Sequence, residues 1–347
     1  MTATSKPVVV KLGTPPDIVG ALPSFIGFHP SESLVVMCLH GPRKRNGLTM
    51  RFDLPEARHH RAMVSEITAR VTREGAGSAI VVCYTAAPDA DGQLPRADLV
   101  VRQVRHLLSR DVEVVEALLV REGRWYSYTC TEPCCPTSGT PIPESPTGGA
   151  ARFASEVALQ GRAVLPDRET LAASVRGPVA LRHIGLAQTY NRVAAEVAGE
   201  LADGDVESFA ARTVSLAREA LDGYIEGRRD LTDDDAARIV LGLHDKPSRD
   251  ELTTWGIDDH ADELVVLLTD LAQRAPDEEA APVCTVLASV VYQQGGGALA
   301  SVALERALRC DPGYTMARML AAMLHGQVEP EELRSLSRTV RRDLRRR

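Results

Sequence analysis

The sequence predicts an α/β N-terminal domain, built on a mixed sheet with helical cover and Rossmann-like in a loose sense, followed by an all-α C-terminal domain. Two observations support this fold class. Up to residue 135, short apolar runs of strand length alternate with segments of helical periodicity, an order that favours a sheet with parallel members and helical cover. From residue 150 onwards, Ala-rich amphipathic helical patterns follow one another to the end of the chain, with no helix predicted over 244–258.

The elements of the first domain follow from local patterns. Residues 33–39 form an apolar run typical of a buried strand, and residues 48–53 alternate apolar and polar side chains as a half-buried strand does. The polar turn at 41–47 contains Asn-Gly, so we expect the two strands to form a hairpin. The same criteria predict helices over 57–74 and 97–109, and strands over 78–84, 112–120 and 124–129. The sequence contains no G-x-G-x-x-G and no P-loop, so it indicates neither a dinucleotide site nor a P-loop nucleotide site.

The domain limits follow from a change in composition. Pro, Gly, Ser and Thr dominate residues 136–149, which we interpret as a linker because such a segment builds no core. This places the α/β domain at 1–135 and the helical domain at 150–347. Within the helical domain, the small residues of 281–312 have the spacing of a tetratricopeptide-like helical hairpin, and Pro312 would end its second helix. A single copy is typical of a packed hairpin, since a peptide-binding array needs about three repeats.

Composition and charge narrow the class of partner. The 347 residues carry a net charge of −7 with the two signs well mixed, whereas a nucleic-acid binder usually has a basic face. The dense basic segment at 341–347 is expected to be a solvated helix end, with contact to an acidic partner or nucleic acid as the alternative. No apolar run is long enough to cross a bilayer, and the first residues lack the apolar region of a signal peptide. We therefore expect a cytoplasmic protein with no membrane partner, whose seven cysteines are mostly reduced.

Four passages, taken in order, point to a known family. They are "PPDIVGALPSFIGFHPSESLVVMCL", "MRFDLP", "WYSYTCTEPCCPTSGTPIP" and "GGGALASVALERALRCDPGYTMARML". Together they resemble domain of unknown function 4192, a family found in actinobacteria, and the resemblance covers nearly the whole chain. It implies a cytoplasmic protein of one stable architecture. It carries over no activity, cofactor or catalytic residue, so we assign no cofactor and leave open whether the protein is an enzyme.

Three of the seven cysteines, Cys130, Cys134 and Cys135, lie within six positions. A structural zinc site usually takes four ligands from two closely spaced pairs, and here a second pair is missing and adjacent cysteines should diverge. A redox centre usually has C-x-x-C spacing, which is absent from this segment. The favoured interpretation is that the thiols pack as small hydrophobes, so we assign no metal ligand. The catalytic alternative is a reactive thiol at Cys135, because the turn follows a strand end, where open α/β sheets place ligands.

The loop before the first strand is a second candidate site. A loop that combines Gly, His29 and the hydroxyls of Ser31 and Ser33 suits a small anion or a polar ligand. Asp17 is expected to N-cap a short helix over 18–22 at the start of this stretch. Asp17, Ser31 and Ser33 are therefore candidate ligand-binding residues, and His29 is a candidate for proton transfer. The alternative is a tight connection in which Gly and Pro provide the backbone angles.

A third candidate lies on the second strand. Arg51 and Asp53 are two residues apart, so their side chains face the same side of the sheet. Arg51 suits bidentate binding of a carboxylate or phosphate, with Asp53 orienting it or acting as a base. The alternative is an ordinary surface ion pair. On the last strand, Tyr126 and Tyr128 share a face, and Tyr128 is a candidate ligand-binding residue with core packing as the alternative.

Two functions fit these observations. The first is a small-molecule hydrolase or transferase, in which Arg51 binds an anionic group and Asp53, His29 or Cys135 acts in catalysis. The second is a non-catalytic regulatory or protein-interaction protein that acts through the helical domain. The expected partner is accordingly a small-molecule ligand or a protein. Polar side chains clustered in a closed pocket favour the first, and a groove of exposed apolar residues on helices over 280–325 favours the second.

Overall fold

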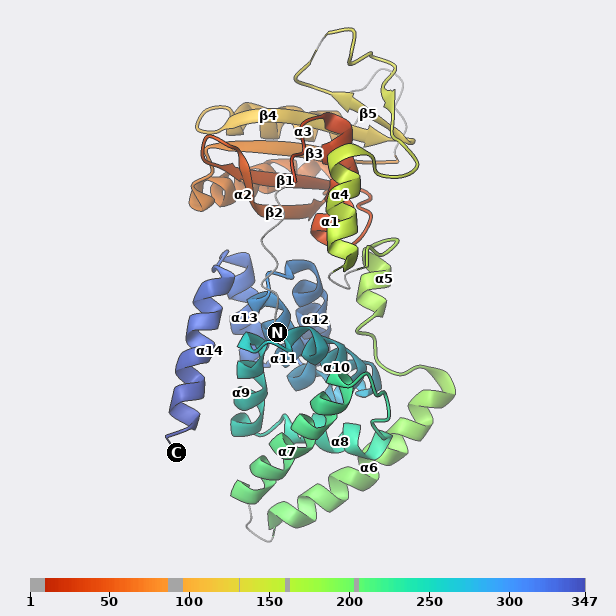
Figure 1. Ribbon diagram of the computed structural model, residues 1–347, viewed down its shortest axis with the longest axis vertical. Helices are drawn as coiled ribbons and strands as arrows, with labels where there is room; N and C mark the ends of the chain where they lie inside the picture. Colours follow the sequence, from red (N-terminus) through yellow and green to blue (C-terminus); the bar gives the residue numbers. More distant parts are fainter. Residues whose placement is uncertain (1–9, 87–95, 131, 160–162, 203–205, 347) are drawn as a thin grey trace. The chain divides into compact units, whose positions relative to one another are not determined.

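The computed structural model describes residues 10–86, 96–130, 132–159, 163–202 and 206–346 (Figure 1). The chain divides into two compact units, Met1–Arg168 and Glu169–Arg347, which we call the N-terminal unit and the C-terminal unit. The first contains a six-stranded mixed sheet with helices, and the described part of the second contains helices but no strand. The predicted fold class is confirmed.

The sheet of the N-terminal unit has the strand order β2-β1-β3-β4-β5-β6. Its strands are β1 (Ser33–His40), β2 (Arg45–Asp53), β3 (Ser78–Tyr84), β4 (Glu113–Arg121), β5 (Arg124–Ser127) and β6 (Thr140–Pro141). The predicted hairpin of β1 and β2 is present, and β1 is antiparallel to both β2 and β3. β3 and β4 are parallel, and the helix α3 (Arg96–Leu108) lies between them in the chain. β1 therefore begins at the edge of the sheet where β2, β3 and β4 end.

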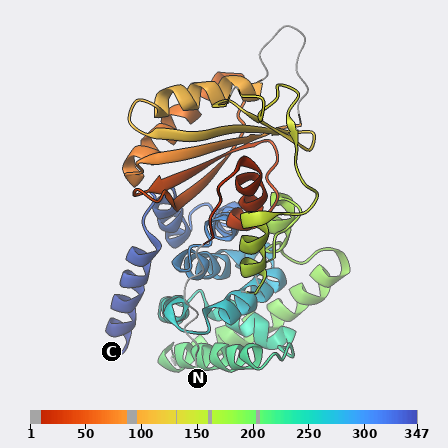
Figure 2. The ribbon, with the colours of Figure 1, turned by 45° about the horizontal axis from the view of Figure 1, so that its top comes forward.

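Helices cover both faces of this sheet. On one face, which we call the α2/α3 face, β1 packs through Leu34 and Val36 on α3 and on α2 (His60–Glu74). On the other, which we call the α1 face, β1 packs through Val35 and Met37 on α1 (Pro15–Ile26). Figure 2 shows α1 and the pair α2 and α3 on opposite sides of the sheet. Burial on both faces explains why β1 and β3 read as continuous apolar runs in the sequence.

The first helix is longer than the predicted helix over 18–22, and Asp17 is not its N-cap. Thr14 is the N-cap, and Pro15 and Pro16 occupy the first turn, where a missing N–H is tolerated and the proline φ already fits a helix. The helix ends at Gly27, which adopts the left-handed conformation with φ 86°. The two prolines therefore belong to the helix start, and the helix begins three residues before the predicted one.

The segment that we interpreted as a linker, 136–149, contains β6 and the first residues of α4 (Gly148–Leu159). α4 packs against α1 within the N-terminal unit, and the chain divides into its two units only after Arg168. Glycine makes the close approach possible. A Cβ atom on Gly149 would lie 2.2 Å from the backbone oxygen of Lys11, and one on Gly20 would lie 3.0 Å from the Cβ of Ala150.

The C-terminal unit is an assembly of helices around α11. The helices are α5 (Arg168–Ala173), α6 (Ala180–Ala202), α7 (Val206–Ile225), α8 (Asp233–Gly242), α9 (Lys246–Thr254), α10 (Ala261–Arg274), α11 (Ala280–Gln293), α12 (Gly297–Cys310), α13 (Thr315–His325) and α14 (Pro330–Leu344). All residues of α11 are buried, so the first helix of the predicted hairpin is the core of this unit. α9 was not predicted from the sequence.

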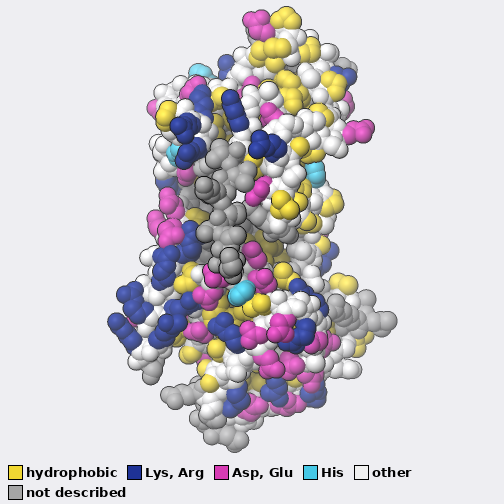
Figure 3. Space-filling model, viewed as in Figure 1, with side chains coloured by type: hydrophobic (Ala, Val, Ile, Leu, Met, Phe, Trp, Pro, Cys, Tyr) yellow, Lys and Arg dark blue, Asp and Glu magenta, His cyan; other side chains and the backbone are white. Residues whose placement is uncertain are grey.

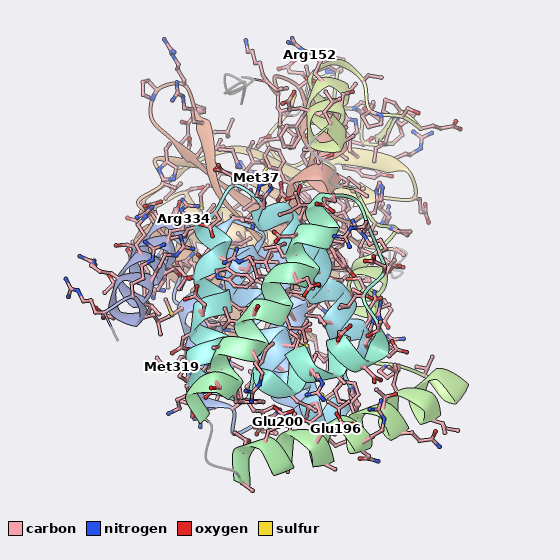
Figure 4. All side chains as sticks on the ribbon, turned by 60° about the horizontal axis from the view of Figure 1, so that its bottom comes forward. Met37, Arg152, Glu196, Glu200, Met319 and Arg334 are labelled. Atoms are coloured by element: carbon pink, nitrogen blue, oxygen red, sulfur yellow. The ribbon has the colours of Figure 1, made fainter. Side chains whose placement is uncertain are left out.

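Arginine side chains connect the helices of this unit. The side chain of Arg306 on α12 is only 2% exposed, and its guanidinium donates to the carbonyl oxygens of Val175 and Ala275, each at 2.7 Å. At another point, Arg238 of α8 donates to Glu200 of α6 at 3.1 Å and also contacts Glu196, and the two glutamates follow one another along α6 (Figure 4). A buried guanidinium is tolerated when its N–H groups are hydrogen-bonded, as most are here.

The close approach of α4 to the segment just before α1 yields a stability prediction. Replacing Gly149 by Ala places a methyl group against the backbone oxygen of Lys11, which cannot move without shifting the chain. We expect Gly149→Ala to lower the free energy of unfolding by about 1–3 kcal/mol. Urea unfolding measures the change.

The matched control is Gly185→Ala on α6, where an added Cβ has no atom within 4 Å. This change should stabilise its helix by about 0.5–1 kcal/mol, because alanine restricts the unfolded chain. Equal effects of the two substitutions would contradict the close approach of α4.

Candidate functional site

Five residues of the N-terminal unit form a line across the sheet at the edge where β1 begins. Ser33 is the Cα partner of both Asp53 and Tyr84, Tyr84 is the partner of Val120, and Val120 is the partner of Trp125. We call these five residues the cross-strand row. Since directly opposed residues point to the same side of a sheet, all five side chains lie on the α1 face.

The cross-strand row contains buried polar atoms that have no hydrogen-bond partner among the described residues. They are the Ser33 Oγ, the Tyr84 hydroxyl and the Trp125 Nε1, and their residues are 0%, 8% and 4% exposed. Arg51 adds a fourth such atom, its Nε, from the same face of β2. Burial raises the pKa of Tyr84, so its hydroxyl keeps its proton at neutral pH and is available as a donor. Folded proteins leave few buried polar groups unpaired, and each one calls for an explanation such as a bound molecule.

Arg51 and Asp53 lie side by side on the α1 face, opposite Met50 and Phe52, as their spacing predicted. The Arg51 Nη2 donates to the Asp53 Oδ1 at 2.6 Å, and the Arg51 guanidinium lies 5.7 Å from the centre of the Phe28 ring. The Arg51 side chain is 14% exposed and that of Asp53 is 80% exposed. The guanidinium is therefore held from both sides while the carboxylate faces solvent.

The residue that fixes this edge is Glu32, which the sequence did not single out. Its carboxylate accepts hydrogen bonds from the Ala86 N–H at 2.6 Å and the Thr85 hydroxyl at 3.0 Å, just beyond β3. Its backbone oxygen accepts from the Leu54 N–H at 2.9 Å, just beyond β2. Glu32 thus connects the start of β1 with the ends of both neighbouring strands.

Two predicted site residues in the loop before Glu32 are exposed. Ser31 and His29 lie at the surface of the loop, and the His29 backbone N–H donates to the Leu165 oxygen at 3.0 Å. They are next to the row in sequence but not part of it.

Asp17 connects two helix starts instead of facing the row. Its carboxylate accepts from the Thr14 hydroxyl at 2.8 Å and from the Gly149 N–H, at the start of α4, at 2.9 Å. Partial burial acts to raise the pKa of Asp17, but the hydrogen bonds from Thr14 and from the backbone of Gly149 and Gly13 outweigh it, so the pKa lies below its ordinary value. This geometry gives Asp17 a structural role.

Tyr128 lies on the α2/α3 face and not with the cross-strand row. Its hydroxyl donates to Asp98 of α3, its ring lies 5.7 Å from the Arg102 guanidinium, and its backbone oxygen accepts from Arg105. Burial and the hydrogen bond to Asp98 raise the pKa of Tyr128. The tyrosine connects the end of β5 to α3.

Cys135 lies with the other two cysteines of its segment. The Sγ atoms of Cys130 and Cys134 are 3.8 Å apart, and those of Cys134 and Cys135 are 3.9 Å apart. The expectation that adjacent cysteines diverge is wrong here, because they lie in a turn closed by the Cys135 N–H and the Glu132 oxygen at 2.9 Å. A hydrogen bond from the Glu132 backbone lowers the pKa of Cys130, whereas burial raises the pKa of Cys135 to about 12.

Of the eight site residues predicted from the sequence, the structure thus brings Ser33, Arg51 and Asp53 together. Tyr84 and Trp125 join them from other strands. The apolar context of Tyr84 in the sequence suggested only a buried strand, and no signal there placed Trp125 in line with it two strands away.

This fold and site define a class: a mixed α/β domain with a polar row at a sheet edge, joined to an all-helical domain. A family model described as Domain of unknown function (DUF4192) matches residues 15–331, and the chain belongs to that family. No curated protein and no solved structure matches the chain significantly. Within the described residues, no helix has both the length and the apolar character that a membrane span needs.

The role of Asp17 predicts a pH-dependent loss of stability. Asp17→Ala removes a carboxylate that accepts hydrogen bonds at the starts of α1 and α4, and we expect it to cost about 1 kcal/mol, and at most about 2 kcal/mol, at pH 7. Because folding lowers the pKa of Asp17, its contribution is fully present above the unfolded pKa of about 3.9 and is lost as pH falls through the folded pKa. Urea unfolding of both proteins, repeated from pH 7 down to pH 3, measures the difference.

The exposed Asp111, replaced by Ala, is the control and should change stability by less than about 0.5 kcal/mol. A difference between wild type and Asp17→Ala that stayed constant to pH 3 would show that the carboxylate charge is not responsible.

Proposed function

We propose that the N-terminal unit binds a small acceptor-rich molecule, a carboxylate or a phosphate, against the cross-strand row. The observation that carries this proposal is a line of three buried polar groups across the sheet, on Ser33, Tyr84 and Trp125, that have no hydrogen-bond partner in the described part of the chain.

The chemistry of these groups defines the ligand. The Trp125 Nε1 and the Arg51 Nε can only donate, and the hydroxyls of Ser33 and Tyr84 can also donate. Four donors on one face suit a molecule that offers several acceptor oxygens, and a charged acceptor forms stronger hydrogen bonds than a neutral one. The row also lies where β3 and β4 end, which is where open α/β sheets place their ligands.

The strand spacing sets the size of the ligand. Ser33 and Tyr84 are on adjacent strands, about 4.8 Å apart, whereas β4 separates Tyr84 from Trp125, which makes that step about 10 Å. A single phosphate or carboxylate suits the first pair. A molecule that reaches Trp125 as well needs the length of a small metabolite.

The hydrolase or transferase suggested by the sequence would use this same row. In that form, Arg51 would hold the anionic group and the exposed carboxylate of Asp53 would accept a proton. Asp53→Asn distinguishes a catalytic site from a site that only binds, since it should abolish turnover while leaving the bound ligand in place. Cys135 lies on another loop, so a hydrolase or transferase at this row would not use its thiol.

Removing an unpaired hydroxyl gives a test in which stability and binding change in opposite directions. Tyr84→Phe deletes a buried polar atom with no described partner, so the ligand-free protein should be more stable, by about 1 kcal/mol. Affinity for the ligand should fall about 10-fold, because one hydrogen bond is lost. Native mass spectrometry of protein purified without added ligand identifies a retained molecule, and thermal shifts with a panel of carboxylates and phosphates measure affinity.

Tyr126→Phe is the matched control, because Tyr126 packs on the α2/α3 face and should leave ligand affinity unchanged. Two outcomes contradict the proposal: Tyr84→Phe destabilising the free protein by more than about 1 kcal/mol, or the two variants binding the panel equally.

A second function, binding of an acidic protein through the C-terminal unit, has a separate observation in its favour. A hollow of about 420 Å³ beside α14 is lined by Ile257 and five arginines, Arg338, Arg341, Arg342, Arg345 and Arg346. Figure 3 shows the basic side chains gathered over α14. α11, by contrast, is fully buried and offers no face to a peptide. We therefore place the interaction surface on α14 and not on the predicted hairpin.

Charge reversal tests this surface. Arg342→Glu combined with Arg345→Glu should weaken binding of a labelled oligoglutamate peptide at least 10-fold, about 1.4 kcal/mol, measured by fluorescence anisotropy at low salt. Arg152→Glu, an exposed change on α4 (Figure 4), is the control and should have little effect. Equal weakening by the α14 double variant and by Arg152→Glu would indicate an effect of net charge alone. Binding of single-stranded DNA more tightly than the peptide would indicate a nucleic-acid partner.

A further inference from the structure

Three thiols meet at one point in the loop after β5, apart from the cross-strand row. The Sγ atoms of Cys130, Cys134 and Cys135 all lie within 4.8 Å of one another, and two of the three separations are 3.8 and 3.9 Å. Zinc–sulfur bonds of about 2.3 Å at tetrahedral angles place two sulfurs about 3.8 Å apart. Two edges of the triangle therefore already have the length that a shared metal ion requires. All three cysteines are free thiols.

The loop that carries these thiols is held at both ends. At the start, the Ser127 hydroxyl accepts from the Cys130 N–H at 3.0 Å and donates to the Glu116 carboxylate at 2.9 Å. At the far end, Arg124 donates to the Gly139 oxygen at 2.9 Å, and β6 pairs with β5. Outer contacts of this kind hold metal ligands in position before the ion arrives.

We propose that Cys130, Cys134 and Cys135 together bind one thiophilic metal ion, with Zn²⁺ as the expected ion and Cu⁺ as the alternative. Three sulfur ligands select soft and borderline ions and disfavour Mg²⁺ and Ca²⁺, which prefer oxygen. The three cysteines come from one short loop, which therefore supplies all the protein ligands of the proposed site.

The exposure of the loop indicates how the coordination is completed. Cys134 is exposed and the other two cysteines are intermediate, so the ion would face solvent on one side. Three protein ligands plus an exchangeable fourth is the arrangement in which zinc keeps an open position. We therefore expect a site that exchanges its metal, in contrast to a closed structural zinc site.

Metal titration of the full-length protein tests the site. Reduced, metal-free protein is titrated with Co²⁺ without oxygen, and the sulfur-to-cobalt charge-transfer absorption is followed. We expect saturation at one Co²⁺ per chain and displacement by one Zn²⁺, with a parallel Cu⁺ titration against a chromophoric chelator deciding which ion binds more tightly. Cys134→Ser should weaken binding at least about 100-fold, since even the loss of an outer contact weakens metal sites 10- to 100-fold.

Cys310→Ser is the matched control, because Cys310 is a partly exposed free cysteine on α12, in the other unit. It should leave the titration unchanged. Substitution of the exposed Cys134 should not disturb folding, which circular dichroism checks. The proposal is overturned if wild type and Cys134→Ser bind Co²⁺, Zn²⁺ and Cu⁺ equally, or if Cys310→Ser removes the absorption as well.

Discussion

The register in which β1 pairs with β2 and β3 is the constraint on which the rest of the N-terminal unit depends. Side chains alternate along a strand, so a slip by one residue would turn Ser33 to the α2/α3 face and bring Leu34 into the cross-strand row. Apolar patterning alone does not prevent that slip, because β1 is buried on both faces from Ser33 to Leu39. Specific polar contacts must therefore select the register.

Glu32 provides those contacts, at a local cost in backbone strain. Its φ of 39° lies in the left-handed region, which costs a residue other than glycine about 1 kcal/mol or more. Hydrogen bonds to a charged group contribute about 1.5–3 kcal/mol each, and the Glu32 carboxylate accepts them from Thr85 and Ala86. These hydrogen bonds offset the strain of the Glu32 backbone. Because they set the register of β1, they also fix the position of Ser33 beside Tyr84.

Local signals were enough for most of the fold and for part of the site. Periodicity predicted the hairpin, the buried strands and most helices, because each depends on neighbouring residues. α9 was missed because its start, with Asp245 as N-cap and Pro247 in the first turn, resembles a polar loop. Tyr84 and Trp125 could not be placed together, since their alignment depends on the register of three strands, β3, β4 and β5. The convergence of the three thiols could not be predicted either, because they lie in a turn, where side chains do not alternate as they do along a strand.

The cross-strand row and the thiol loop share one core, which connects the two proposed sites. Cys135 packs against the apolar cluster on the α1 face that contains Tyr84 and Trp125, and the strand after the thiol loop pairs Thr140 with Trp125. An ion that drew the three sulfurs together would act on Cys135, which packs against the cluster that contains Trp125. Linkage makes any such coupling reciprocal, so a ligand on the row would change the affinity for metal by the same factor as metal changes the affinity for the ligand.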